Sequence, residues 1–309
     1  MRPDPILISG SHRSGSTWVG RMLALAQGTV YIDEPFHRRH NSGVCYAKSR
    51  HSYLYICDEN EDDGNWHAAL NRTLQPRYSP IAGARAIRSL PDLGRMMRDW
   101  GRFTAARMLE YRPLMKDPLA FFSTPWIARR FDASVVLLTR HPAAFASSLA
   151  RLNWTFDFSN WLDQPLLMRD LLGPWREELL KAHAQPGDVI DQACLLWKVI
   201  AGVTMRWRDE YPNWVFTTHE SLSRDPLTQF QLLFDALELP FNERVREAIV
   251  ATTKSSNAHE APANVAHSLN RDSVTNITNW KSRLTAEQIS RVREAIGQAA
   301  DPFYNEGEW

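Results

Sequence analysis

Residues 6–25 predict a strand, a glycine-containing loop and a helix in immediate succession, and this arrangement constrains the fold more than any other part of the sequence. Ile6-Leu7-Ile8 is a short apolar run typical of a buried strand, and apolar residues recur with a helical period from Trp18 through Leu25. The loop between them reads SGSHRSGST, a run of small residues suited to a tight turn. A strand that enters a helix in this way is a common start of a parallel βαβ unit.

Four more strands are predicted farther along the chain, separated by helical patterns. The clearest is Ser134–Thr139, whose run VVLLT is typical of a central parallel strand buried on both faces. The others are Val30–Ile32, Pro113–Lys116 and Trp214–Thr218. Helices are expected over about 81–108, 166–182, 189–208, 226–237 and 285–299, with one further helix that ends near residue 131 and another that begins at residue 142. Strands that alternate with helices indicate an α/β fold, P-loop-like, with a mainly parallel central sheet and helices on both faces.

Residues 1–309 are expected to form a single domain with two insert or lid segments. The segments 36–80 and 255–278 show little hydrophobic periodicity, and the second is part of an Asn/Ser/Thr-rich stretch that we expect to be a long loop from Lys254. Long loops inside compact domains often serve as lids over a site. The last helix should begin at Thr285, with Gln288 completing a capping box.

Composition excludes several classes of protein. The formal net charge is +1, so we expect neither nucleic acid nor a broad anionic membrane surface as a partner. The three cysteines, Cys45, Cys57 and Cys194, have no disulfide or zinc spacing. No run reaches the ~18 apolar residues of a membrane span, and residues 1–9 do not resemble a signal peptide, so a cytoplasmic protein is expected.

The loop after the first strand fits the nucleotide P-loop pattern with one departure. Gly10, Gly15 and Thr17 are in place, but Ser16 stands where the pattern has lysine. That lysine serves the β- and γ-phosphates of a triphosphate, so its absence argues against triphosphate chemistry. Backbone N–H groups at a helix N-terminus still bind an anion, and Arg13 supplies a cation within the loop.

The run Arg13-Ser14-Gly15-Ser16-Thr17-Trp18 resembles the 5′-phosphosulfate loop of sulfotransferases, which use 3′-phosphoadenosine-5′-phosphosulfate (PAPS). Small-molecule cytosolic members have Lys-Ser-Gly-Thr-Thr-Trp there, and many carbohydrate sulfotransferases have Arg-Ser-Gly-Ser-Ser. The resemblance implies that Arg13 contacts the sulfonyl group and the bridging oxygen. It also implies that Ser14, Gly15, Ser16 and Thr17 hold the 5′-phosphate, and that Trp18 stacks on adenine. Trp18 is an equally good candidate for a packing residue at the start of the helix.

A second segment resembles the 3′-phosphate motif of the same family. That motif is a buried strand ending in Arg, with Pro two residues later and Ser eight residues after the Arg, as in Arg140, Pro142 and Ser148. Ligands of open α/β sheets bind at the carboxyl ends of the strands, where Arg140 is expected. Asn279-Trp280-Lys281 resembles the late Trp-Lys segment of the family, so Arg271 and Lys281 are candidates for closing over the 3′-phosphate, although the Arg-Lys-Gly triplet of the family is absent.

The general base must be found elsewhere than in the cytosolic members, which have a histidine two residues after a lysine on the strand before the 3′-phosphate strand. Here that place reads Lys116-Asp117-Pro118, so only Lys116 carries over, as a contact to the sulfonyl group. Asp33-Glu34-Pro35 resembles a Glu-Pro of carbohydrate sulfotransferases whose Glu is proposed as the base, which makes Glu34 the candidate. Asp117, His37 and His12 are the alternatives. The run Arg38-Arg39-His40 is a candidate acceptor contact or, more commonly for such a run, a solvated loop.

The resemblance implies transfer of a sulfonyl group from PAPS to a hydroxyl, with no metal required. The acceptor is expected to be a glycan or a small molecule with hydroxyl groups, and the Glu-Pro with Arg13 favours a carbohydrate. Two alternatives stay open: a P-loop small-molecule kinase, and a non-catalytic nucleotide- or glycan-binding protein. The sequence leaves the oligomeric state open.

Overall fold

The computed structural model describes residues 3–254 and 273–309, and its centre is a five-stranded sheet in the order β2-β3-β1-β4-β5. All five predicted strands are confirmed, with bounds β1 Ile6–Gly10, β2 Thr29–Asp33, β3 Arg112–Lys116, β4 Ser134–Thr139 and β5 Val215–Thr218. The residues of β1 and the middle of β4 are buried, as expected for strands covered on both faces. The mainly parallel α/β fold is therefore confirmed.

Strand register places the ends of β2 and β3 side by side. Strand β3 runs parallel to both β1 and β2, with Ile8 and Asp33 each opposite Lys116. Because parallel strands end at the same edge of a sheet, the residues that follow β2 and β3 emerge together.

The chain forms two compact units. The first contains residues 1–9 and 19–136, and the second contains residues 10–18 and 137–309. The loop of residues 10–17 and the segment 140–148 belong to the second unit, whereas Glu34 and Lys116 belong to the first. A single domain over 1–309 stays a prediction.

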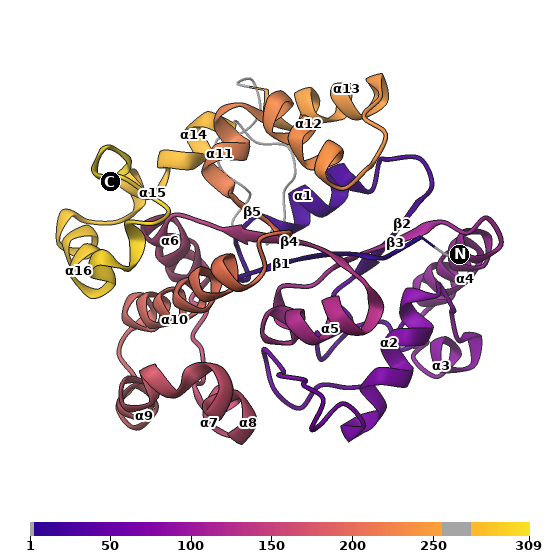
Figure 1. The fold of residues 1–309 in the computed structure, drawn as a ribbon, viewed down its shortest axis with the longest axis horizontal. Coiled ribbons are helices and arrows are strands. Elements are labelled where there is room, and N and C mark those ends of the chain that lie inside the picture. Colours follow the sequence, from indigo (N-terminus) through magenta and orange to yellow (C-terminus); the bar gives the residue numbers. More distant parts are fainter. Residues whose placement is uncertain (1–2, 255–272) are drawn as a thin grey trace. The chain divides into compact units, whose positions relative to one another are not determined.

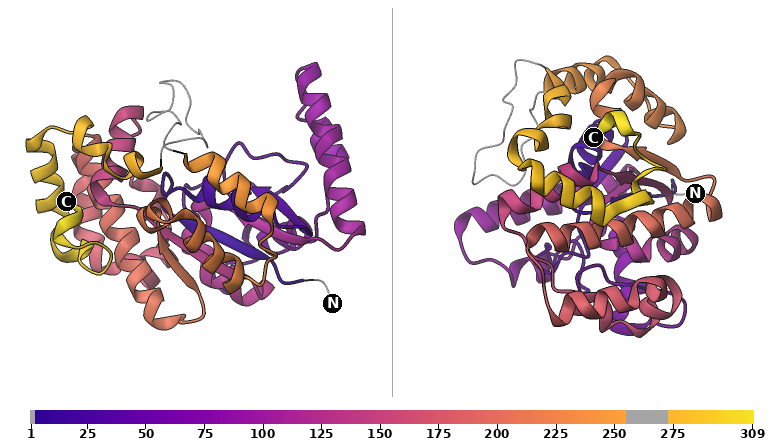
Figure 2. Two further views of the ribbon diagram at one scale, coloured as in Figure 1. Left: turned by 90° about the horizontal axis from the view of Figure 1, so that it is seen from above. Right: turned by 90° about the vertical axis from the view of Figure 1, so that its left-hand side faces the viewer.

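In the first unit the strands lie between α1 on one side and α2 and α5 on the other (Figure 1). Helix α4 is the longest helix of this unit and extends away from the unit's strands (Figure 2, left). The helices are α1 Ser16–Leu23, η1 Asp63–Asn65, α2 Trp66–Leu74, α3 Pro80–Ala84, α4 Leu90–Met108, η2 Pro118–Ser123 and α5 Thr124–Phe131.

The second unit is mostly helical, and helix α6 is its central element. Residues 142–149 of α6 are all buried, and Pro142 starts the helix as predicted, because proline suits the first turn. The helices are α6 Pro142–Leu152, α7 Ser159–Leu162, α8 Pro165–Leu167, η3 Met168–Leu172, η4 Gly173–Trp175, α9 Arg176–Ala184, α10 Val189–Glu210, α11 His219–Arg224, α12 Pro226–Ala236, α13 Glu243–Thr253, α14 Ser273–Thr278, α15 Trp280–Arg283, α16 Ala286–Ile296, η5 Gly297–Ala300 and η6 Glu306–Glu308.

Two predictions of secondary structure were wrong in part. The single helix expected over 166–182 is four short pieces with a π-helical turn, because Pro174 cannot continue an α-helical hydrogen-bond ladder. The long loop expected from Lys254 ends in helix α14, and residues 255–272 lie outside the described residues. The capping box of Thr285 and Gln288 is confirmed, with both reciprocal hydrogen bonds present. Among the described residues, no helix is long and apolar enough to cross a membrane.

Candidate active site

Two glycines shape the loop between β1 and α1. A Cβ on Gly10 would stand 2.2 Å from the carbonyl oxygen of Leu138, so only glycine lets the loop begin this close to β4. A Cβ on Gly15 would stand 2.6 Å from Nδ1 of His219. Both glycines have positive φ, as does Arg13 at 64°. The conformation therefore depends on these two positions being glycine.

The loop has the character of an anion cradle. The hydroxyl of Ser14 is buried and has no hydrogen-bond partner among the described residues, and Ser16 is also buried. Helix α1 starts at Ser16, and the first N–H groups of a helix have no partner within it. A buried, unpaired hydroxyl beside such N–H groups fits the phosphate that the sequence predicts here.

Arg13, Arg140 and Ser148 come together, as the two sequence motifs predict. Nε of Arg13 donates to the hydroxyl of Ser148 at 3.0 Å, and Nη1 of Arg140 donates to the carbonyl oxygen of Arg13 at 3.0 Å. The guanidinium of Arg13 also lies over the ring of Trp154, 5.6 Å from its centre. Arg13 and Ser148 are 135 positions apart in the sequence, and the fold brings them together with Arg140 into one cationic cluster.

The charge of Arg140 interacts with neighbours that the sequence did not reveal. Burial lowers the pKa of Arg140, Glu220 opposes that change, and Arg283 and Arg151 add to it. Glu220 accepts from the backbone N–H of His141 at 3.1 Å and from the hydroxyl of Tyr304 at 2.9 Å. Nε of Arg140 is buried without a partner among the described residues, so it has hydrogen-bonding capacity for a ligand.

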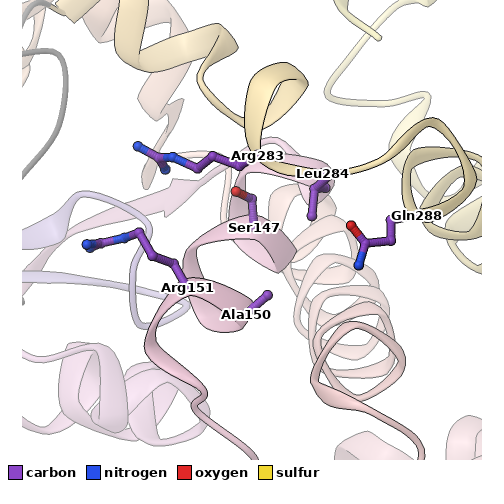
Figure 3. Close-up of a pocket in the computed structure, with 6 residues that line it drawn as sticks. All are labelled: Ser147, Ala150, Arg151, Arg283, Leu284 and Gln288. Carbon is purple, nitrogen blue, oxygen red and sulfur yellow. The ribbon is translucent and has the colours of Figure 1, made fainter. Parts of the chain in front are cut away.

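A cavity of about 400 Å³ lies beside helix α6, lined by Ser147, Ala150, Arg151, Arg283, Leu284 and Gln288. Arg151 from α6 and Arg283 from α15 extend on the same side of this cavity (Figure 3). The hydroxyl of Ser147 is buried and has no partner among the described residues. Both arginines are close enough to Arg140 to lower its pKa. Only the helical spacing of Ser147 and Arg151 signalled this cluster in the sequence.

Lys281, one of the two residues predicted to close the 3′-phosphate site, is not among the described residues that line this cavity. Nζ of Lys281 donates to the main-chain oxygen of Trp309 at 2.6 Å and lies over the ring of Trp280. Arg271 lies outside the described residues. In the same segment Trp280 stacks on His141 at 5.0 Å, which joins α15 to the start of α6.

Trp18 and His12, which flank the loop centre, both have aromatic neighbours. Trp18 packs edge-on against Phe230 at 5.0 Å, and its Nε1 donates to Thr252 at 3.3 Å. Stacking of Trp18 on adenine stays a prediction. Desolvation and the charge of Arg13 lower the pKa of His12 to about 4, which makes it a weak base.

The first unit holds a second cluster, formed by Lys116, Glu34 and Asp33. Lys116 is only 2% exposed, and its Nζ contacts Asp33 at 2.8 Å and forms a charge-assisted hydrogen bond with Glu34. Burial opposes the charged form of Lys116, but the two carboxylates outweigh it and raise the pKa of the ammonium group. Glu34 has a φ of 43°, and its N–H donates to the carbonyl oxygen of Lys116 at 2.9 Å.

Asp117 supports the turn that carries Glu34 and is not exposed to solvent. One carboxylate oxygen accepts from the N–H of Phe36 at 2.6 Å and the other from the N–H of Leu119 at 2.9 Å. Burial and the charge of Glu34 raise the pKa of Asp117 to about 8. Asp117 is 0% exposed, so an acceptor arriving from solvent cannot reach it directly. It is therefore a poorer candidate base than the half-buried Glu34.

The arginines that follow Glu34 lie on the surface. Arg38 and Arg39 are exposed, and Arg38 donates to the carbonyl oxygen of Arg50 at 2.5 Å. Nδ1 of His37 accepts from the N–H of Arg39 at 3.1 Å. Exposure of both arginines is typical of a solvated loop, and contact of this run with the acceptor stays a prediction.

Comparison with known proteins identifies the family. The sulfotransferase domain matches residues 3–303, so the chain belongs to the sulfotransferase family. It is an enzyme that takes its sulfonyl group from PAPS.

Similar solved structures share low sequence identity with this chain. Mouse sulfotransferase SULT7A1 complexed with PAP is 14% identical, with 97% of this chain and 86% of that chain covered and a TM-score of 0.45. Sulfotransferase STF9 from Mycobacterium avium is 13% identical, covering 99% and 78% with a TM-score of 0.46. A retinol dehydratase in complex with androsterone and inactive cofactor PAP is 12% identical, covering 99% and 84% with a TM-score of 0.45. Comparison with curated proteins gives no match.

Proposed function

We propose that this PAPS-dependent sulfotransferase acts on a hydroxyl group of a carbohydrate, with Glu34 as the general base. The pairing of Glu34 with buried Lys116 at the ends of β2 and β3 carries the proposal. A half-buried carboxylate held by a fixed ammonium group is positioned to accept a proton from a bound alcohol. The Glu34-Pro35 sequence, similar to that of carbohydrate sulfotransferases, supports the choice of acceptor.

The second unit supplies the groups that would hold the donor. Ser14, Gly15, Ser16 and Thr17 would bind the 5′-phosphate, and the unpaired buried hydroxyl of Ser14 supports that role. Arg140 and Ser148 would bind the 3′-phosphate, supported by the unpaired Nε of Arg140. The bound donor supplies an activated sulfonyl group and leaves as adenosine 3′,5′-bisphosphate (PAP).

The side chains divide the work of the transfer among them. Glu34 accepts the proton of the acceptor hydroxyl. The acceptor oxygen bonds to sulfur as the bond from sulfur to the nucleotide oxygen breaks. Arg13 would stabilise the negative charge that develops on that oxygen, and Lys116 would contact the sulfonyl oxygens. Fixed cations at the points where charge develops are usually the largest contribution to such a reaction.

Calorimetric titration tests the nucleotide assignment first. PAP should bind at micromolar concentration or below without a metal ion, and ATP with magnesium should bind much more weakly. Clear magnesium-dependent ATP binding with no PAP binding would instead support the kinase alternative.

A panel of acceptors tests the reaction itself. With a radiolabelled donor, transfer of the sulfonyl group should be faster to glycans than to simple phenols or sterols. PAP binding with no transfer to any hydroxyl compound would favour the non-catalytic alternative. Transfer to small apolar alcohols alone would retain the enzyme assignment and reject the carbohydrate acceptor.

A further inference from the structure

Helix α4 has an apolar face that no described element of its own unit covers. Of the twelve large apolar side chains that are exposed in the described part of the chain, seven lie between residues 81 and 109. Four of them lie in the first eleven residues of α4: Leu90 is 84% exposed, Met97 51%, and Leu93 and Trp100 41% each. The buried residues of α4, Phe103 and Ala106, are on another face.

Spacing places these exposed residues in one stripe. Leu90, Leu93, Met97, Trp100 and Thr104 follow each other at intervals of three and four, the repeat by which two helices pack along a common seam. The acidic residues of α4 point elsewhere: Asp92 pairs with Arg95, and Asp99 with Asn41 and Arg102. The stripe itself contains no charged residue, as is typical of the centre of a protein interface.

Two glycines widen the stripe, and the isolated chain gives no reason for them. A Cβ added to Gly94 or to Gly101 would meet no atom within 4 Å, so neither glycine is required by packing. Glycine disfavours a helix interior more than any residue except proline. Seven residues apart, the two glycines lie on the same edge of the stripe, where they leave space for close approach of another backbone.

The stripe is symmetric about Met97. Leu93 and Gly94 stand four and three residues before it, and Trp100 and Gly101 stand three and four residues after it. In an antiparallel pair related by a twofold axis at Met97, Leu93 of one copy lies beside Trp100 of the other along one edge. Gly94 lies beside Gly101 along the opposite edge. Such self-complementarity is what a symmetric dimer interface requires.

We propose that this enzyme forms a dimer in which α4 pairs antiparallel with α4 of a second copy. The register places Leu90 of the second copy opposite Thr104. A hollow of about 340 Å³ lies there, lined on α4 by Trp100, Thr104, Arg107 and Met108 and on its other side by residues 76–78, and it offers room for that end of the second helix. The proposal does not depend on the reaction or on the acceptor.

Sedimentation velocity of the full chain over a wide concentration range tests the proposal. We expect a reversible monomer–dimer equilibrium, weakened at least tenfold by Met97→Lys, which places two ammonium groups at the twofold axis. The matched control is Leu232→Lys, at an exposed leucine (56%) of another helix, α12, which should not change the equilibrium.

A second variant separates association from folding. Gly94→Ala with Gly101→Ala should raise the melting temperature of the monomer, because alanine favours the helix and no atom obstructs it. The same variant should weaken dimerisation at least tenfold, because the added methyl groups hold the two backbones apart. A dimer that this variant strengthens would contradict the proposal.

Oxidative crosslinking tests the register. Met97→Cys should give a disulfide-linked dimer, and Leu90→Cys should not, because an antiparallel pair separates the two copies of residue 90. Crosslinking of both variants would reject the antiparallel arrangement. The unchanged chain is the control for its own cysteines, of which Cys45 and Cys194 are buried.

Three other results would overturn the proposal. One is a chain that stays monomeric at every concentration, and another is a dimer that Met97→Lys leaves intact. The third is a monomer that binds vesicles of anionic phospholipid through the same stripe. The effect of salt distinguishes the last case. Added salt weakens binding to an anionic membrane, but it should strengthen the dimer slightly, because it screens the repulsion between the two Arg98 side chains that border the glycine edge.

Discussion

Replacing Arg140 with alanine should remove most of the preference of this enzyme for nucleotides with a 3′-phosphate. The matched ligands are PAP and adenosine 5′-monophosphate, which differ only in that phosphate. A charge-assisted hydrogen bond contributes about 1.5–3 kcal/mol, so the ratio of the two affinities should fall about 10- to 150-fold. The affinity for the monophosphate should change much less, because its phosphate is assigned to the loop of Ser14–Thr17.

Using a ratio protects this measurement from the structural role of Arg140. The guanidinium also donates to the carbonyl oxygen of Arg13 and favours the charged form of Glu220, so its loss will destabilise the fold. If the substitution only destabilises the fold, it lowers the affinities for both nucleotides by the same factor, and their ratio does not change. Isothermal titration of the alanine and lysine variants, with melting curves for each, provides the assay. Equal losses for the two nucleotides would refute the assignment of Arg140 to the 3′-phosphate.

Three further predictions follow from the same contacts. Glu34→Gln should lower kcat by about 10²–10⁴ without changing PAP affinity, as calorimetry and sulfonyl-transfer assays will show; unchanged kcat would eliminate Glu34 as the base. Arg283→Ala and Arg151→Ala should each weaken PAP several-fold and the monophosphate hardly at all, and titration that shows no such selectivity would separate the cavity beside α6 from the nucleotide site. The folded state holds the proton of Asp117 up to about pH 8, whereas the unfolded chain releases it near pH 4, so this group lowers stability as pH rises between those values. Asp117→Asn should therefore flatten that fall in denaturant unfolding measured from pH 5 to 8, and an unchanged slope would contradict the raised pKa.

The strands could be predicted because each is a local run of apolar residues. Ser134–Thr139 has the same bounds in the structure as in the prediction, and β1, β2, β3 and β5 differ by two residues or fewer at either end. The helix at 166–182 failed where Gly173-Pro174 interrupts a helical pattern, since periodicity does not register a missing N–H group. Helix α14 was missed because Asn, Ser and Thr have weak helix propensity and only tertiary packing selects the conformation.

The candidate site divides along the same line. The sequence placed Arg13 in the loop, Arg140 directly after a strand and Ser148 in the helix that follows, because both motifs depend on local spacing. It missed Glu220 and Tyr304, which support Arg140 from residues 80 and 164 positions away, since nothing local marks them as neighbours. It also chose Lys281 where the structure has Arg283 lining the cavity, because two residues of a helix point in different directions.

By itself the sequence determined the α/β architecture, the glycine-containing loop between β1 and α1, and the family, because these depend on short runs of neighbouring residues. Only the tertiary structure decided which side chains complete the site. The hydrogen bond from Arg13 to Ser148, the support of Arg140 by Glu220 and the pairing of Lys116 with Glu34 each join residues 80 or more positions apart. Such contacts depend on how strands and helices pack, and a linear pattern of residues does not contain that information.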